Sequence, residues 1–237
     1  MKFFEADNAG MEPAAEAENN IRLINASLAI LENNKIVDAL AKPLPHVDFE
    51  DLQRKVDQNF LVDASSITTR MARFFHAISG YKNPSNIFVA GSFQANSIVW
   101  LAGGSRLSCR VIGVDPDVEA CQVARKNLKA IGFNNVEIFD ARAEDLDCAK
   151  LDEIQLLLLD ADHPTQGKRI NIDILEHLKP RLSPEALILA HDACWPSFEN
   201  DFKEYSQYLR HAFPECCSIK LALDSFGVLV TQAKIAK

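Results

Sequence analysis

The sequence predicts an α/β protein with a doubly wound, mostly parallel sheet, a C-terminal antiparallel strand pair and an N-terminal helical extension. From residue 86 onward, short apolar runs alternate with amphipathic helical stretches, which is the pattern of repeated βαβ units. The run IQLLLL at 154–159 is apolar except for Gln155, as expected of a strand that helices cover on both faces. A chain of 237 residues, 48% of them hydrophobic, is long enough for one such domain plus an extension.

The N-terminal part of the chain is predicted to be helical. Residues 1–20 are acidic and rich in Ala and Asn without clear periodicity, so a loosely docked arm is expected there. Apolar residues recur at helical spacing over 21–40, 49–60 and 67–80. We expect residues 1–62 to form an arm and a helical cap, or a dimer surface over the sheet edge, with ordinary packing on the core as the alternative.

The remaining elements alternate, and residues 63–237 are expected to form a Rossmann-like domain. The expected strands are 86–90, 111–115, a short run that ends at Asp140, 154–159, 186–190, 218–223 and 227–231. The expected helices are 97–104, a stretch between Asp115 and Gly132, 170–182 and 196–212. The last two strands would close the sheet as an antiparallel pair.

Composition and charge narrow the function classes. The formal net charge of −8 disfavours nucleic acid as the main partner. The six cysteines form no CxxC pair and no regular framework, so they are expected to be reduced. The first twenty residues lack the apolar core of a signal peptide, and no stretch approaches the ~20 apolar residues that span a bilayer. We therefore expect a cytoplasmic protein without a membrane partner.

Polar residues follow the predicted strands at the points where the strands end. Gly91, Asp115, Asp140, Asp160 and His191 each come at or directly after the end of an apolar run. In an open parallel sheet these ends share one edge, and ligands bind outside that edge. An acid there commonly accepts hydrogen bonds from ribose hydroxyls, so Asp115 is the first candidate site residue. A single ligand-binding crevice is expected.

The turn after the first strand, GSFQANS at 91–97, is a second candidate for ligand binding. Gly91 would let a ligand approach the backbone, and the next helix would offer free N–H groups. Gly91 precedes Asp115 by a little more than the ~20 residues typical of a glycine turn and a ribose-binding acid. The GxGxxG fingerprint is absent, and an ordinary tight turn is the alternative.

Two further strand ends supply groups for chemistry. Asp160 and Asp192 could hold a hard divalent ion through oxygen ligands, although either acid could instead cap a helix or bond a loop amide. His163 could act as a general base near neutral pH, with a polar rim histidine as the alternative. For His191, helix capping, substrate contact and a ligand role are all open. Trp195 is expected to line or close the pocket, or simply to pack under a loop.

At these motifs the sequence resembles the class I S-adenosylmethionine-dependent methyltransferases, and among them the small-molecule O-methyltransferases of the catechol and caffeoyl-CoA type. The stretch 111–146 (VIGVDPDVEACQVARKNLKAIGFNNVEIFDARAEDL) resembles the second and third motifs of that family. The stretches LLLLDADHPTQG and LILAHDACWP resemble the two strand ends that carry its chemistry. The likeness extends from about Asp63 to the C-terminus.

The resemblance implies a cofactor, S-adenosylmethionine, and a divalent cation such as Mg2+. It implies that Asp160 and Asp192 bind the metal and that His163 and Asp160 are catalytic. The cofactor-binding residues would be Gly91, Ser92, Ser97, Asp115, Pro116, Asp140, Ala141 and Asp160. The sequence departs from the family at three positions: Val89 replaces an acid in the first strand, Ala193 replaces a metal-binding asparagine, and His163 replaces a lysine.

The expected function is O-methylation of a small hydroxylated metabolite or natural product, by a chain that binds a small-molecule substrate and forms a homodimer. Two alternatives stay open at this point. The turn VAGSFQANSIVWLA is also similar to nicotianamine-synthase-like proteins, which transfer the aminocarboxypropyl group of S-adenosylmethionine. A non-catalytic binding protein with a degenerate cofactor site is the other alternative. An NAD-linked dehydrogenase is disfavoured because its glycine fingerprint is missing.

Overall fold

A computed structural model describes residues 13–37, 47–61, 67–105 and 108–235 of the chain. Its strands are β1 (Asn86–Ala90), β2 (Arg110–Asp115), β3 (Val136–Asp140), β4 (Ile154–Leu159), β5 (Leu182–His191), β6 (Cys217–Leu221) and β7 (Val228–Gln232). They form one sheet in the order β3-β2-β1-β4-β5-β7-β6. Strands β1 to β5 are parallel, whereas β7 is antiparallel to both β5 and β6. The predicted fold class is confirmed.

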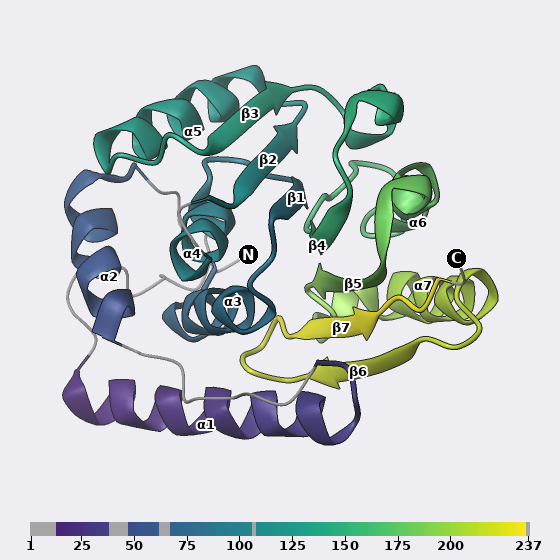
Figure 1. The fold of residues 1–237 in the computed structure, drawn as a ribbon, viewed down its shortest axis with the longest axis horizontal. Helices are drawn as coiled ribbons and strands as arrows, with labels where there is room; N and C mark the ends of the chain where they lie inside the picture. The colour runs from purple at the N-terminus through teal and green to yellow at the C-terminus, as the bar shows by residue number, and fades with distance from the viewer. Residues whose placement is uncertain (1–12, 38–46, 62–66, 106–107, 236–237) are drawn as a thin grey trace.

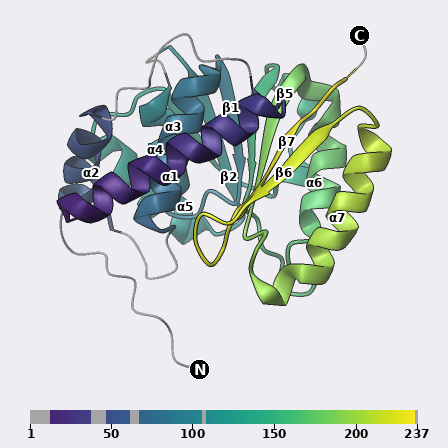
Figure 2. The same cartoon turned by 90° about the horizontal axis from the view of Figure 1, so that it is seen from below.

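Helices cover both faces of this sheet (Figure 1). They are α1 (Ala14–Asn33), α2 (Val47–Asn59), α3 (Thr69–Lys82), α4 (Asn96–Gly104), α5 (Val118–Ala130), α6 (Ile170–Leu178) and α7 (Glu199–Ala212). Figure 2 shows α1 to α5 on one side of the sheet and α6 and α7 on the other. This arrangement is the doubly wound architecture, in which ligands bind at the carboxyl edge of the parallel strands.

Alternate residues of the central strands feed two separate hydrophobic clusters. On β1, Ile87 and Val89 belong to the cluster beneath α3, α4 and α5, whereas Phe88 and Ala90 belong to the cluster beneath α6 and α7. Successive side chains of a strand point to opposite faces of the sheet. Because both faces are covered, a central strand is apolar at nearly every position, which explains the IQLLLL run of β4, in which the one polar residue, Gln155, is only half-buried.

The N-terminal helices belong to the same core. Helix α1 begins at Ala14, earlier than the sequence predicts, so residues 14–20 of the expected arm are helical. Its buried residues Ile24, Leu28 and Leu31 share one hydrophobic cluster with α3 and α4. Residues 1–12 and 38–46, which include the end of the expected first helix, lie outside the described residues. Among the described helices, none has the length and apolarity needed to span a membrane.

Candidate functional site at the carboxyl edge of the sheet

The carboxyl ends of β1 to β5 lie along one edge of the sheet. Asp115 and Asp140 are register partners at the ends of β2 and β3. Asp160 directly follows β4, and its backbone N–H donates to the carbonyl of Ala90 at the end of β1 over 2.8 Å. His191 is the last residue of β5. The structure therefore brings the predicted strand-end residues to one edge.

The turn between β1 and α4 connects the two halves of this edge. The N–H of Phe93 donates to Asp115 Oδ2 (2.9 Å), and Ser97 Oγ lies 3.5 Å from Asp160 Oδ2. Gly91 has φ +84°, and a Cβ there would lie 2.6 Å from backbone atoms directly after β4. Gly91 is thus required for the close approach of the turn to β4, whereas the sequence suggested that its role was to admit a ligand.

The N-terminus of α4 has backbone donors that no side chain caps. Ala95, which precedes the helix, is buried with φ +69° and has no side-chain oxygen to offer. The first N–H groups of a helix lack partners within the helix, and they favour an anion. Nearby in the same turn, Ser92 Oγ is buried without a hydrogen-bond partner among the described residues. The free N–H groups of α4 and the hydroxyl of Ser92 could together bind the carboxylate of a ligand.

The two acids at the ends of β2 and β3 have different surroundings. Asp115 is half-buried, its second oxygen accepts from a backbone N–H two residues on (3.0 Å), and burial raises its pKa. Asp140 is exposed and forms an ion pair with Arg125 (3.0 Å). Pro116 and Ala141, which follow these acids, are exposed and half-buried respectively. A carboxylate has about four lone-pair sites, so Asp115 can still accept from a ligand hydroxyl.

Four charged or titratable side chains converge at the ends of β4 and β5. Lys168 Nζ lies 3.0 Å from Asp160 Oδ1 and 2.7 Å from Asp192 Oδ2. His191 Nδ1 lies 3.1 Å from Asp160 Oδ1 and 3.3 Å from Asp192 Oδ1. The Lys168 side chain is 3% exposed and those of the two acids are 16% exposed. The sequence predicted both acids at this point but did not predict Lys168.

A comparison with known families identifies the domain that this edge belongs to. Residues 88–193, which run from within β1 to just past β5 and include Asp160 and Asp192, match the family model Methyltransf_24, a methyltransferase domain. This part of the chain is therefore similar to methyltransferase domains. No curated protein matches the chain in sequence.

Solved methyltransferases share the fold of this domain. An O-methyltransferase from Bacillus cereus in complex with SAH gives a TM-score of 0.64 at 18% identity, covering 90% of this chain and 100% of that chain. An SAH-bound methyltransferase from Podospora anserina gives 0.62 at 15%, covering 96% and 100%. The O-methyltransferase TomG from Streptomyces achromogenes, in complex with SAM, gives 0.61 at 13%, covering 88% and 96%. At these identities the likeness establishes the fold.

Charges within the cluster at the ends of β4 and β5 compensate one another. Burial alone would raise the pKa of Asp160, but the positive charges of Lys168 and His191 outweigh it, and the pKa lies well below its usual range. Burial alone would lower the pKa of Lys168, but Asp160 and Asp192 outweigh it and raise that pKa. The pKa of His191 is likewise raised, because Asp160 outweighs the effect of burial. Asp160 and Lys168 are therefore both charged at neutral pH.

The expected metal centre does not fit the cluster as it is arranged. Asp160, His191 and Asp192 do offer three ligand atoms within 4.8 Å of one another. However, the ammonium group of Lys168 lies between the two carboxylates that would bind the ion. Mg2+ and Ca2+ need six or more ligands, mainly oxygen, and Ala193, which follows Asp192, is buried and apolar. The described residues thus place a lysine where the sequence predicted a divalent cation.

His163 makes its contacts within its own loop. It forms a short antiparallel bridge with Gly167, and its Nδ1 accepts from the N–H of Thr165 (3.3 Å) and lies 3.1 Å from the hydroxyl of that residue. A neutral imidazole whose Nδ1 accepts a hydrogen bond carries its proton on Nε2. Its lone pair is then already used. This geometry disfavours the general-base role that the sequence suggested for His163.

Aromatic side chains lie beside the cluster. The ring of Trp195 stacks on that of Phe226 at a centroid distance of 5.0 Å. The ring of His191 is 6.2 Å from Phe226 and 6.0 Å from Phe75. These rings form an apolar wall next to the acids. Trp195 is half-buried, in agreement with a position at the margin of the site.

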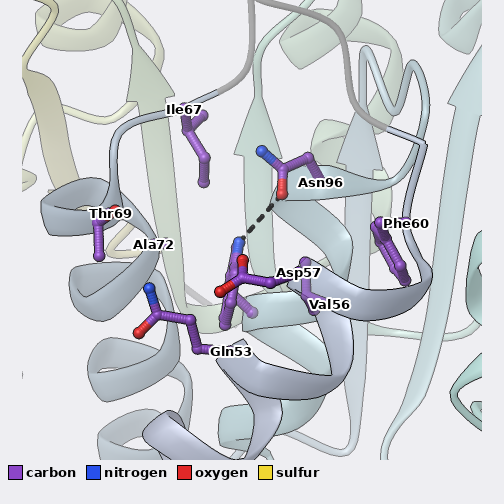
Figure 3. A pocket seen from close by; sticks show the side chains of 9 residues that line it. Gln53, Val56, Asp57, Phe60, Ile67, Thr69, Ala72 and Asn96 are labelled. Atoms are coloured by element: carbon purple, nitrogen blue, oxygen red, sulfur yellow. Dashed lines mark hydrogen bonds between the residues drawn. The ribbon is translucent and has the colours of Figure 1, made fainter. Parts of the chain in front are cut away.

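A cavity of about 140 Å³ lies beside the N-terminus of α4, on the side of the N-terminal helices (Figure 3). Its lining residues are Gln53, Val56, Asp57, Phe60, Ile67, Thr69, Ala72, Asn96 and Trp100. Asn96 Oδ1 accepts from Trp100 Nε1 (3.2 Å), and burial raises the pKa of Asp57. Asn96 is the chain neighbour of Ser97, so the cavity adjoins the turn described above. No sequence pattern indicates this cavity, because it forms where three separate helices meet.

Proposed function

We propose that the protein transfers the methyl group of S-adenosylmethionine to a hydroxyl group of a small metabolite. One observation carries this proposal: the turn after β1 contacts both Asp115 and Asp160. Asp115, which we assign to the nucleoside, and the cluster of charged groups around Asp160 therefore lie along one continuous edge of the sheet. A location in the cytoplasm and a homodimer, both expected from the sequence, belong to the same proposal.

The described residues suit the parts of S-adenosylmethionine. Asp115 would accept hydrogen bonds from the ribose hydroxyls. The N-terminus of α4, which no described side chain caps, and the hydroxyl of Ser92, which has no hydrogen-bond partner among the described residues, would bind the carboxylate of the methionine end. Asp140 and Ala141 would lie near the adenine. The methyl group would then approach Asp160, whose side chain is close to Ser97 at the start of α4.

The chemistry requires alignment more than covalent help. The methyl group of a sulfonium ion is already electrophilic, so the protein must place the acceptor oxygen, the methyl carbon and the sulfur in line. The carboxylates of Asp160 and Asp192 have lone pairs beyond those that Lys168 uses, and these can accept a hydrogen bond from the acceptor hydroxyl. Such a bond would orient the hydroxyl; as the methyl–sulfur bond breaks and the methyl–oxygen bond forms, the hydroxyl proton would be released to solvent. The apolar wall of Trp195 and Phe226 would exclude water.

Isothermal titration with S-adenosylmethionine tests the cofactor part of the proposal. The titration is run once with EDTA and once with Mg2+. We expect saturable one-to-one binding under both conditions, and the same experiment on Asp115→Ala identifies the site. Absence of binding under both conditions would contradict the proposal. A panel of phenols, catechols and sugars is then incubated with the protein and S-adenosylmethionine. Mass spectrometry identifies the class of acceptor as the compounds that gain one methyl group.

A further inference from the structure

The side chain of Lys168 uses its whole hydrogen-bonding capacity within the acidic cluster. A lysine ammonium has three N–H donors and no acceptor. Three oxygens lie within reach of Nζ: Asp160 Oδ1 at 3.0 Å, Asp192 Oδ2 at 2.7 Å and the backbone carbonyl of Asp160 at 3.1 Å. The ammonium therefore bonds both acids at once, as a bound cation would.

The backbone of Lys168 is held in place by contacts with α7 and within its own loop. Its backbone N–H donates to Asp201 Oδ2 on α7 (3.0 Å). The preceding Gly167 has φ +56°, and a Cβ there would lie 2.6 Å from that same Asp201 oxygen. The bridge between His163 and Gly167 closes the loop that leads to the lysine. These contacts hold the backbone at Lys168 and direct its buried side chain toward the carboxylates.

We propose that Lys168 takes the place of a divalent metal ion in this site, so that the protein works with a cation supplied by its own chain. A divalent ion between Asp160 and Asp192 would have to displace an ammonium that is buried and fully hydrogen-bonded. The donor set also lacks a side-chain oxygen at Ala193. The ammonium of Lys168 is covalently attached to the chain, needs no further oxygen ligand, and holds the same two carboxylates in place.

The consequence for the reaction, which rests on the proposed function, is that Lys168 acts as a positioning residue. Since its three donors are used, it has none left for the acceptor oxygen. It fixes the orientation of Asp160 and Asp192, whose remaining lone pairs would bind the acceptor hydroxyl. A single positive charge between the two carboxylates leaves the cluster one charge unit less positive than a dication would, which suits the sulfonium group of the cofactor better.

Binding of Mn2+ tests this inference without any measurement of turnover. Free Mn2+ is followed by electron paramagnetic resonance during titration of the wild-type protein and three variants: Lys168→Ala, Lys168→Arg and the double variant Lys168→Ala with Asp192→Ala. We expect no stoichiometric binding by wild type or Lys168→Arg. Lys168→Ala should bind one Mn2+ at least about tenfold more tightly, and the double variant should lose that binding.

The inference would be overturned if the wild-type protein bound one Mn2+ per chain and the Asp192→Ala variant did not. This arm is decisive even if Lys168→Ala does not fold, because it needs only wild type and an acid variant. Lys150→Ala is the matched control, since Lys150 pairs with Asp147 at an exposed site (3.2 Å) and its removal should create no Mn2+ site. If Lys168→Ala binds Mn2+ and wild type does not, but no methyl transfer is found, the inference stands and the proposed function fails.

Discussion

Asp115 and Asp140 face each other across the ends of β2 and β3, yet only Asp115 has a carboxylate that two backbone N–H groups hold in place. Asp140 is exposed and contacts the side chain of Arg125. A carboxylate that is already oriented loses less conformational freedom on binding than one that must be ordered by the ligand. Of the two predicted acids, Asp115 is therefore the better placed for ribose.

Substitution of Asp115 should weaken binding of S-adenosylmethionine much more than substitution of Asp140. Hydrogen bonds to a charged group contribute about 1.5–3 kcal/mol, so Asp115→Ala should raise the Kd by roughly ten- to a hundredfold. Asp140→Ala is the matched control and should change the Kd by less than about threefold. Titration calorimetry measures both. Equal losses in the two variants would contradict the assignment of Asp115.

Removal of the buried lysine should destabilise the protein strongly. Lys168→Met leaves Asp160 and Asp192 without their compensating charge, and breaking a buried ion pair costs about 3–5 kcal/mol. Lys203→Met is the control, because Lys203 pairs with Glu199 at an exposed site and should cost less than about 1 kcal/mol. Urea unfolding at pH 7 gives both values. A loss below about 1 kcal/mol for Lys168→Met would show that the lysine does not compensate the acids.

Stability should depend on pH through His191. Its pKa is raised above the ordinary value of 6.5 in the folded protein, so its contribution is complete below that value and is lost as pH rises through the folded pKa. The groups that face it are Asp160, Asp192, Lys168 and the rings of Phe75 and Phe226. The stability difference between wild type and His191→Gln should thus be larger at pH 6 than at pH 9. Urea unfolding at the two pH values measures this difference, and a larger difference at pH 9 than at pH 6 would contradict the prediction.

His163 should tolerate substitution better than Asp160. Because the lone pair of His163 is used within its own loop, His163→Gln should retain methyl transfer within about threefold of wild type. Asp160→Asn should lower the rate by at least about a hundredfold, since the group would no longer orient the acceptor. Release of S-adenosylhomocysteine measures both rates. A hundredfold loss in His163→Gln would restore the histidine as the general base.

The edge of the sheet can be predicted from the sequence because its physical basis is local. Each strand is an apolar run, each run ends in a polar residue, and parallel strands share one carboxyl edge. The sequence alone therefore predicts that Asp115, Asp140, Asp160 and His191 lie together. The bounds of β1 and β4 match the expected ranges, since Asn86–Ala90 and Ile154–Leu159 stand out as apolar segments.

The rest of the site depends on contacts that a linear pattern does not contain. Lys168 lies in an irregular loop, where a lysine is usually solvated, and its burial follows from the contact of its loop with Asp201 on α7. Gly91 could be recognised as special, but only the structure shows that the end of β4 fills the space beside it. The cavity at Asn96 forms between helices distant in the sequence.

The by-product of the reaction tests the central claim most directly. The protein is incubated with S-adenosylmethionine and a mixture of small hydroxylated compounds, and the nucleoside product is identified by mass spectrometry, with Asp115→Ala as the control. Methyl transfer predicts S-adenosylhomocysteine together with an acceptor heavier by one methyl group, and loss of both in the variant. Formation of methylthioadenosine would instead show transfer of the aminocarboxypropyl group and would contradict the account.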